Sequence, residues 1–210
     1  MSGSYYHKIR SRLPDEFVQA CRRYNVAPTR WCLVASVLHQ RISLYERLPV
    51  RPAFQPCGLR RHCYGGDSAN HAFYYRWRRD YIMSSSRFGI GQRTGSQGTP
   101  LGLHRVARKI GGGHPVGAVF VGRVPVGLTW DGKPDAKIVH RILWLDGLEH
   151  GLNRGGDVDS YRRYIYIHGV GEELTLGKPA SCGCLHLSGS DLIPLFDLLP
   201  VGTLVWISAT

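Results

Sequence analysis

Hydrophobic and polar positions alternate along most of the chain, and apolar residues recur at helical spacing in only two segments. Residues 11–24 predict a short helix, with Ser11 as its cap. Residues 188–200 predict a second helix, in which Ser190 is the expected cap and Pro200 closes the segment. The chain is therefore expected to contain few helices, all of them short.

Most of the remaining chain has the alternation and the β-branched and aromatic residues of strands. Residues 30–47 predict a hairpin. Further strands are predicted within 73–90, after a turn at 98–102, within 118–127, 137–145 and 162–169, and over 202–208. Several short strands without a repeating strand–helix–strand order indicate a mainly β fold, either a β-sandwich or a β-barrel.

One segment departs from this pattern. Residues 48–72 are rich in proline and glycine and have no hydrophobic period, so an irregular, basic insertion is expected at about 48–79. It contains Cys57, His62 and Cys63, which are residue types that bind zinc. Their spacing lacks a second pair of ligands, so the sequence predicts no metal site.

The composition narrows the class of protein. With 43% hydrophobic residues among 210, the chain can form a real core, and its six cysteines are too few for a disulfide scaffold. No apolar run reaches the roughly 18 residues that a membrane-spanning helix needs. The first residues, MSGSYYHKIRSRLPDEF, lack the apolar stretch of a secretory signal. A cytoplasmic protein is expected, or a periplasmic one if a leader has been removed.

The formal net charge of +12 is concentrated in the first part of the chain. Residues 1–80 hold 14 Lys and Arg against 5 Asp and Glu, a difference of +9. These basic residues are scattered among turn residues and do not share one helix with base-stacking aromatic residues. A solvated surface or an acidic ligand explains them better than nucleic acid, which is not an expected partner.

The residues with the clearest chemistry lie near the C-terminus, where YIYIHG is followed by a loop and then by SCGC. His168 ends a predicted strand, and a histidine that the fold brings to a cysteine can remove the proton of its thiol. Cys184 follows Gly183, which permits unusual backbone angles, and the N–H groups of residues 182–184 can converge as an oxyanion hole. The spacing alone fits equally well with small buried thiols and a structural histidine.

This segment resembles the signature of the YkuD-type L,D-transpeptidases, in which a strand ends in HG and a loop leads to [S/T]HGC. His168-Gly169 and Ser181-Cys182-Gly183-Cys184 occupy those positions. The stretches TPLGLHRVARKIGGG, RILWLDGLEHGLNRGG and DLIPLFDLLPVGTLVWI resemble other parts of the family, including proteobacterial members. The resemblance covers most of residues 30–207. It implies a β-sandwich or barrel-like catalytic domain over 30–210, and the helix predicted at 11–24 makes residues 1–29 an N-terminal helical extension.

The resemblance also implies a reaction and assigns residue roles. Cys184 would be the nucleophile, His168 the base, and the carbonyl region of Gly169 would orient the ring. Ser181, Cys182, Gly183 and His186 would form the oxyanion hole and bind the substrate. The substrate would be the tetrapeptide stem of peptidoglycan or a muropeptide, which loses its terminal D-Ala and acylates the cysteine. The acyl group then passes to an amine or to water, without a metal or organic cofactor.

The chain departs from the family pattern at two positions. Cys182 replaces the histidine of the motif, and His186 replaces a frequent Arg or Asn. Arg141 is a candidate substitute for the missing anion anchor, and Cys182 raises the alternative that the two thiols and two histidines bind a soft metal or oxidise. Three other functions stay open: a cytoplasmic L,D-carboxypeptidase in muropeptide recycling, a non-catalytic wall-binding module with a degraded site, and, less favoured, a nucleic-acid binder.

Overall fold

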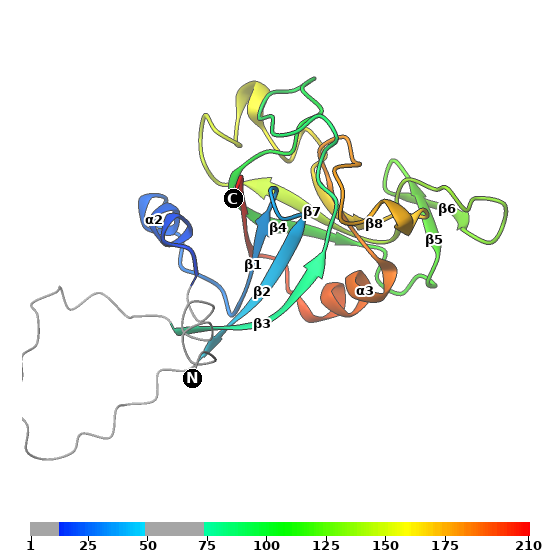
Figure 1. The fold of residues 1–210 in the computed structure, drawn as a ribbon, viewed down its shortest axis with the longest axis horizontal. Coiled ribbons are helices and arrows are strands. Elements are labelled where there is room, and N and C mark those ends of the chain that lie inside the picture. The colour runs from blue at the N-terminus through cyan, green and yellow to red at the C-terminus, as the bar shows by residue number, and fades with distance from the viewer. Residues whose placement is uncertain (1–12, 49–73) are drawn as a thin grey trace, which may run out of the picture.

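The computed structural model describes residues 13–48 and 74–210 and shows a mostly β fold, as predicted (Figure 1). Two α-helices, α2 (Asp15–Arg23) and α3 (Gly189–Leu198), accompany the strands in this part of the chain. The strands are β1 (Trp31–Ser36), β2 (Arg41–Leu48), β3 (Tyr74–Ile82), β4 (Gly102–Ile110), β5 (Ala118–Val121), β6 (Val124–Leu128), β7 (Val139–Gly147), β8 (Tyr166–Gly169), β9 (Leu185–Leu187) and β10 (Leu204–Ser208). Two short 3-10 turns, η1 (Gly156–Val158) and η2 (Glu173–Thr175), lie in the loops.

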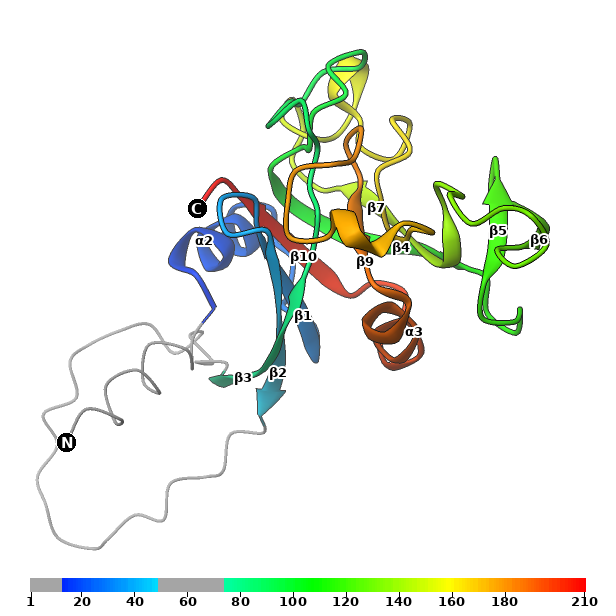
Figure 2. The same ribbon diagram turned by 45° about the vertical axis from the view of Figure 1, so that its right-hand side comes forward.

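All ten strands belong to one mixed sheet, in the order β3-β2-β1-β10-β4-β7-β5-β6, with β8 and β9 branching from β7. The predicted hairpin at 30–47 is confirmed as the antiparallel pair β1 and β2. Two pairs are parallel, β1 with β10 and β8 with β9. The chain beyond β3 returns to β9, where Ser84 forms a bridge with His186. The sheet is therefore strongly curved, and the chain that continues from β3 lies beside the branch strand β9 (Figure 2).

The main hydrophobic core lies inside this curved sheet, and α3 covers one end of it. Leu192, Leu195 and Phe196 of α3 are buried in this core. The helix is capped by Ser188, whose side chain accepts a hydrogen bond from the Asp191 N–H. The prediction that Ser190 is the cap is wrong. Ser188 has the extended backbone that a cap requires, whereas Ser190 already lies in the first turn.

A second core forms between α2 and the outer face of the sheet. Phe17 of α2 is fully buried and stacks on Trp206 of β10, with ring centroids 6.1 Å apart. The helix begins at Asp15, and Pro14 occupies the cap position without a side-chain hydrogen bond. The predicted cap Ser11 lies outside the described residues. Burial of one apolar face thus holds α2 on the sheet.

Two predicted strands have different limits in the structure. The run 118–127 is not one strand but the hairpin of β5 and β6, because Gly122 (φ 53°) and Arg123 (φ 73°) form its two-residue turn. The run 162–169 contributes only its second half, since Tyr164 takes a positive φ of 58° and β8 begins two residues later. Both figures show the β5–β6 hairpin projecting from the rest of the sheet.

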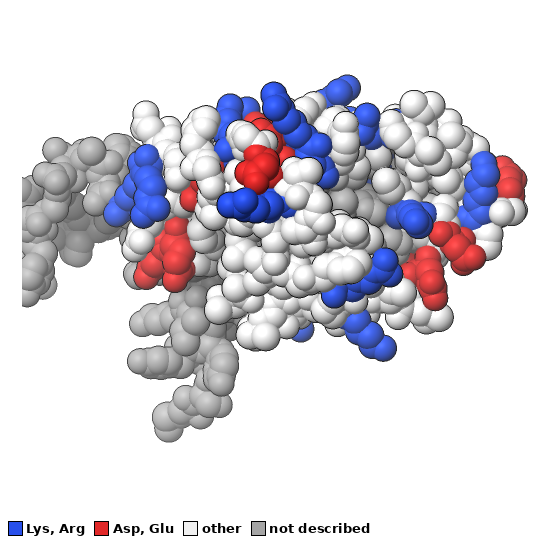
Figure 3. Space-filling model, turned by 90° about the horizontal axis from the view of Figure 1, so that it is seen from above, with Lys and Arg blue, Asp and Glu red and all other residues white. Residues whose placement is uncertain are grey.

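Part of the predicted insertion at 48–79 is described. Residues 74–79 form the first part of β3, paired with β2, whereas 49–73 lie outside the described residues together with Cys57, His62 and Cys63. In the described ranges, no helix is long and apolar enough to cross a membrane. Figure 3 shows the Lys and Arg side chains of one face in separate groups, several of them next to Asp or Glu.

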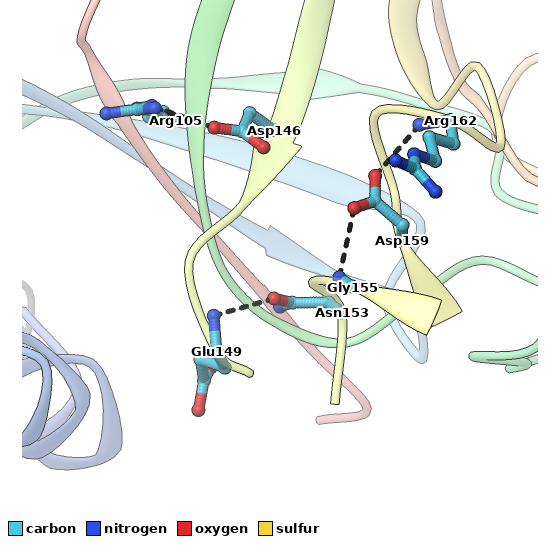
Figure 4. A network of polar contacts seen from close by, with 7 residues as sticks. All are labelled: Arg105, Asp146, Glu149, Asn153, Gly155, Asp159 and Arg162. Carbon is cyan, nitrogen blue, oxygen red and sulfur yellow. Dashed lines mark hydrogen bonds and ion pairs between the residues drawn. The ribbon is translucent and has the colours of Figure 1, made fainter. Parts of the chain in front are cut away.

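A network of polar contacts shapes the loop that leads from β7 to β8 (Figure 4). The Asp159 carboxylate accepts hydrogen bonds from the Gly155 N–H and the Arg162 N–H, both at 2.9 Å. The Asn153 side chain accepts from the Glu149 N–H, also at 2.9 Å. These bonds satisfy backbone groups that the irregular loop would otherwise leave unpaired. The loop thereby delivers the chain to the start of β8.

Candidate active site

The pairing of β8 with β9 brings the two predicted reacting residues to the same face of the sheet. In this parallel pair His168 lies opposite His186, so Cys184, one residue before β9, is level with Tyr166. Side chains alternate along strands, so Tyr166 and His168 of one strand share a face with Cys184 and His186 of the other. Parallel strand spacings place the Cα atoms of His168 and Cys184 about 8 Å apart, within reach of their side chains.

The His168 ring is held in one orientation. Its Nδ1 lies 2.9 Å from the Gly169 carbonyl oxygen, which can only accept, so the neutral ring carries its proton on Nδ1. Burial lowers the pKa of His168 to about 4. At neutral pH the ring is therefore uncharged, and its Nε2 carries a free lone pair. No described residue lies within hydrogen-bond distance of this Nε2, and it is not among the atoms sealed from solvent.

Gly169 also has a steric reason to be glycine. A Cβ at this position would lie 2.7 Å from His140 Cδ2 and 2.8 Å from the Val139 oxygen. The strand β7 therefore approaches the backbone of Gly169 so closely that no side chain fits. This close packing fixes the carbonyl that orients His168.

Ser181 organises the SCGC turn. Its Oγ donates to the Cys184 carbonyl at 2.6 Å and accepts from the Gly183 N–H at 3.1 Å, while its own N–H donates to the Ser85 carbonyl at 3.0 Å. Gly183 takes a φ of 125°, a conformation that other residues rarely adopt. The predicted oxyanion donors are thus not equivalent. The Gly183 N–H is already bonded, whereas the Cys182 and Cys184 N–H groups meet no acceptor among the described residues.

The two thiols of the turn have different surroundings. Cys184 is half-buried, its Sγ donates to the Tyr164 carbonyl at 3.4 Å, and burial raises its pKa to about 11. Cys182 is exposed, with its Sγ 3.8 Å from a guanidinium nitrogen of Arg87. No hydrogen bond joins the Cys184 thiol to the His168 ring. The resting pair is a neutral thiol near a neutral imidazole, and the thiol has to turn away from Tyr164 to reach Nε2.

His186 lies beside the base and Arg141 does not. The ring centroids of His168 and His186 are 4.7 Å apart, and burial lowers the pKa of His186 to about 3, with a further contribution from His168. Its Nδ1 is buried without a partner. Arg141 is buried near α3, 5.7 Å from the Phe196 ring, and donates to the His140 carbonyl. His186 thus lies against the predicted base, whereas the described contacts of Arg141 are with His140 and Phe196.

Sequence reasoning missed an aromatic cluster on the same side of the sheet. Cys184 packs against a small core that includes Trp144 and Tyr166. Tyr161 stacks on Trp144 at 4.1 Å, and Tyr164 lies 5.8 Å from it. Period-2 alternation in YRRYIYIHG offered a signal for Tyr164 and Tyr166, but the turn at Tyr164 interrupts that alternation. The described residues contain no group of three or more His, Cys, Asp and Glu able to hold an ion.

Comparisons with known proteins identify the family of this chain. The family model of the L,D-transpeptidase catalytic domain, YkuD, matches residues 67–207. No curated protein is significantly similar in sequence.

Similar solved structures include Bd1075 of Bdellovibrio bacteriovorus (12% identity, 86% of this chain and 48% of that one, TM-score 0.49). They also include L,D-transpeptidase 3 of Mycobacterium tuberculosis (17%, 85% and 61%, 0.44) and an L,D-transpeptidase of Mycobacterium smegmatis (14%, 86% and 59%, 0.46). The chain thus spans about half to three fifths of the length of these structures.

Proposed function

The chain belongs to the YkuD family of L,D-transpeptidase catalytic domains, and from this premise we propose that it is a cysteine acyltransferase acting on tetrapeptide stems of peptidoglycan. One observation supports this most directly. The register of β8 and β9 gives Cys184 and His168 a common face, and the Gly169 carbonyl leaves His168 Nε2 as the free nitrogen. This pairing of a thiol with an oriented base is what nucleophilic acyl transfer requires.

The first half-reaction forms a thioester. His168 Nε2 takes the proton of the Cys184 thiol while Sγ attacks the carbonyl carbon of the third stem residue. The negative charge that develops on the carbonyl oxygen is stabilised by the N–H groups of Cys182 and Cys184, which have no other acceptor among the described residues. The tetrahedral intermediate collapses, the C–N bond to the terminal D-Ala breaks, and His168 returns the proton to the leaving amine.

The second half-reaction releases the enzyme. An amine or a water molecule gives a proton to His168 and attacks the thioester carbonyl, and the proton then returns to Cys184. Since burial lowers the pKa of His168 to about 4 and raises that of Cys184 to about 11, proton transfer accompanies each attack and no stable ion pair precedes it. An amine acceptor makes the reaction a transpeptidation, and water makes it an L,D-carboxypeptidase reaction.

The experiment follows the terminal D-Ala by mass spectrometry. The protein is incubated with a disaccharide tetrapeptide, alone and with an added D-amino acid. Release of D-Ala is expected in the parent and in Cys182→Ala, and not in Cys184→Ala. An exchanged product indicates transfer to an amine, whereas a tripeptide indicates hydrolysis. Substrate that stays intact under all conditions, or equal rates for the parent and Cys184→Ala, would contradict the proposal.

A further inference from the structure

Arg123 lies at the tip of the β5–β6 hairpin and reaches across to the aromatic cluster around the candidate active site. Its φ of 73° is a left-handed conformation that non-glycine residues seldom adopt. The hairpin joins β7 through a single paired position, Val119 with Val139. Ala118 and Phe120 of β5 also pack against Ile142 and Trp144 of β7, and the contacts of Arg123 add to this packing at the tip of the hairpin.

Three aromatic side chains hold the guanidinium in place. Its central carbon lies 4.9 Å from the Trp144 ring and 4.8 Å from the Tyr164 ring, which is the geometry of cation–π contacts. Its Nη1 donates to the Tyr166 hydroxyl at 3.1 Å. The cation is thus fixed before any ligand arrives.

The guanidinium has unused hydrogen-bond donors. None of the described Asp or Glu side chains lies within ion-pair distance of it, and its Nε and Nη2 have no acceptor in the described part of the chain. Neither nitrogen is sealed from solvent. The half-buried Arg163 is different, because it donates to the Gln92 and Gly98 carbonyls at 2.8 Å. Of these two arginines, Arg123 is the one whose guanidinium keeps N–H donors without a partner among the described residues.

Arg123 and the thiol share their neighbours. The Tyr164 carbonyl accepts the hydrogen bond of the Cys184 thiol, and the Tyr164 ring lies against Arg123. Tyr166, which bonds Arg123, packs in the same small core as Cys184. Arg123 therefore contacts two residues, Tyr164 and Tyr166, that also pack against or bond the candidate nucleophile.

We infer that Arg123 is a specificity-determining residue that binds a carboxylate of the peptide substrate, an inference that rests on the proposed function. A free, oriented guanidinium makes paired, charge-assisted hydrogen bonds to a carboxylate. A tetrapeptide stem offers two carboxylates close to the bond that breaks. One is the terminal carboxylate of the leaving D-amino acid, and the other is the side-chain carboxylate of the third residue.

The test measures binding separately from turnover. Cys184→Ala provides a protein that binds without reacting, and Arg123→Gln is added to it. The ligands are the disaccharide tetrapeptide and two analogues, in which the terminal or the side-chain carboxylate is an amide. Arg108→Gln is the matched control, since Arg108 also lies over Trp144, at 5.7 Å, but contacts it from β4. Calorimetry gives each Kd, and kcat/KM is measured in the same set with Cys184 intact.

Arg123→Gln is expected to weaken binding of the tetrapeptide about tenfold to a hundredfold, the range of a charged hydrogen bond. Amidation of the contacted carboxylate has the same effect in the parent and no further effect in Arg123→Gln, which identifies that carboxylate. Arg108→Gln changes the Kd less than about twofold.

Three results would overturn the inference: unchanged binding in Arg123→Gln, equal weakening for all three ligands, which indicates a structural role, or no binding of any ligand. The proposed function fails separately. If the protein binds the tetrapeptide in a way that depends on Arg123 but releases no D-Ala, the proposed reaction is wrong and the carboxylate site stands.

Discussion

His104 and His168 have nearly the same surroundings but differ in what lies beyond the ring. Both are buried, both place Nδ1 near a backbone carbonyl (Gly102 at 3.0 Å and Gly169 at 2.9 Å), and burial lowers the pKa of each to about 4. His104 Nε2 lies 2.9 Å from Ser160 Oγ. His168 Nε2 has no partner in the described residues. His104 therefore has a partner at both ring nitrogens (a closed histidine), whereas His168 has a free Nε2 (an open histidine).

The thiols repeat this comparison. Burial raises the pKa of both Cys32 and Cys184 to about 11. Cys32 of β1 is fully buried in the core beneath α2, whereas Cys184 is half-buried at the edge of a turn with free N–H groups. A shifted pKa therefore does not distinguish a reacting group from a structural one in this protein. The distinguishing feature is an atom without a partner among the described residues, such as His168 Nε2, or a side chain that is only half-buried, such as Cys184. The following experiments test that distinction.

The largest difference is expected between substitutions of the two histidines. His168→Ala removes the only free ring nitrogen of the pair and should lower kcat for D-Ala release about 10³-fold, the range of a lost general base. His104→Gln, in which an amide replaces the bond to Ser160, should leave kcat within about threefold of the parent. Both rates are measured on the disaccharide tetrapeptide.

Urea unfolding of both variants separates chemistry from folding. His168→Ala should stay folded at the assay temperature, so its loss of activity cannot come from unfolding. Equal losses of kcat in folded His104→Gln and His168→Ala would end the distinction between a closed and an open histidine.

A second effect concerns the pH dependence of stability, which the two histidines share. Unfolded histidine has a pKa of 6.5, while the folded protein keeps His104 and His168 neutral down to about pH 4. The unfolded chain therefore binds more protons within this range. The stabilisation is full above pH 6.5 and is lost as the pH falls toward 4, by up to roughly 3 kcal/mol for each ring.

Urea unfolding at pH 7 and at pH 4.5 measures this loss. His104→Gln removes one of the contributions, so its free energy of unfolding should fall less between the two pH values than that of the parent. A steeper fall in the variant would show that His104 is not buried in its neutral form.

Sequence reasoning identified the family of the chain and the candidate motif more readily than the arrangement of the residues around it. The motif at 181–184 and the histidine at 168 were recognisable because strand end, turn glycine and thiol are local features. Arg123 was not, because its left-handed turn is usually formed by Asn or Gly, and the run 118–127 reads as a single strand.

The surroundings of Arg141 were not predictable for a related reason. His140 takes a positive φ of 67°, and the register of β7 with β8 shifts between Val139 and Ile142. Simple alternation along the strand does not hold across such an irregularity. The sequence therefore does not reveal that this side chain packs near Phe196 of α3.

A third, smaller effect is expected from substitutions of two serines, Ser181 in the SCGC turn and Ser160 beside His104. Ser181→Ala leaves the Gly183 N–H and the Cys184 carbonyl without their partner, and should lower kcat/KM about tenfold as the turn loosens. Ser160→Ala leaves His104 Nε2 unpaired, and should lower the free energy of unfolding by about 1–3 kcal/mol with kcat/KM unchanged. Kinetics and urea unfolding on both variants measure the two effects. A loss of activity in Ser160→Ala as large as that in Ser181→Ala would contradict the comparison.

Among the substitutions within the candidate site, the smallest change in activity is expected at Cys182. Because its contribution to the reaction is a main-chain N–H, Cys182→Ala should keep kcat/KM within about threefold of the parent.

Labelling with a thiol reagent measures the accessibility of the cysteines without substrate. The exposed Cys182 should be labelled first, the half-buried Cys184 more slowly, and Cys32 only when the protein unfolds, because exposure and not pKa separates Cys184 from Cys32. If Cys32 were labelled as fast as Cys184 in the folded protein, the two thiols would be equally accessible, and accessibility would not distinguish the proposed nucleophile.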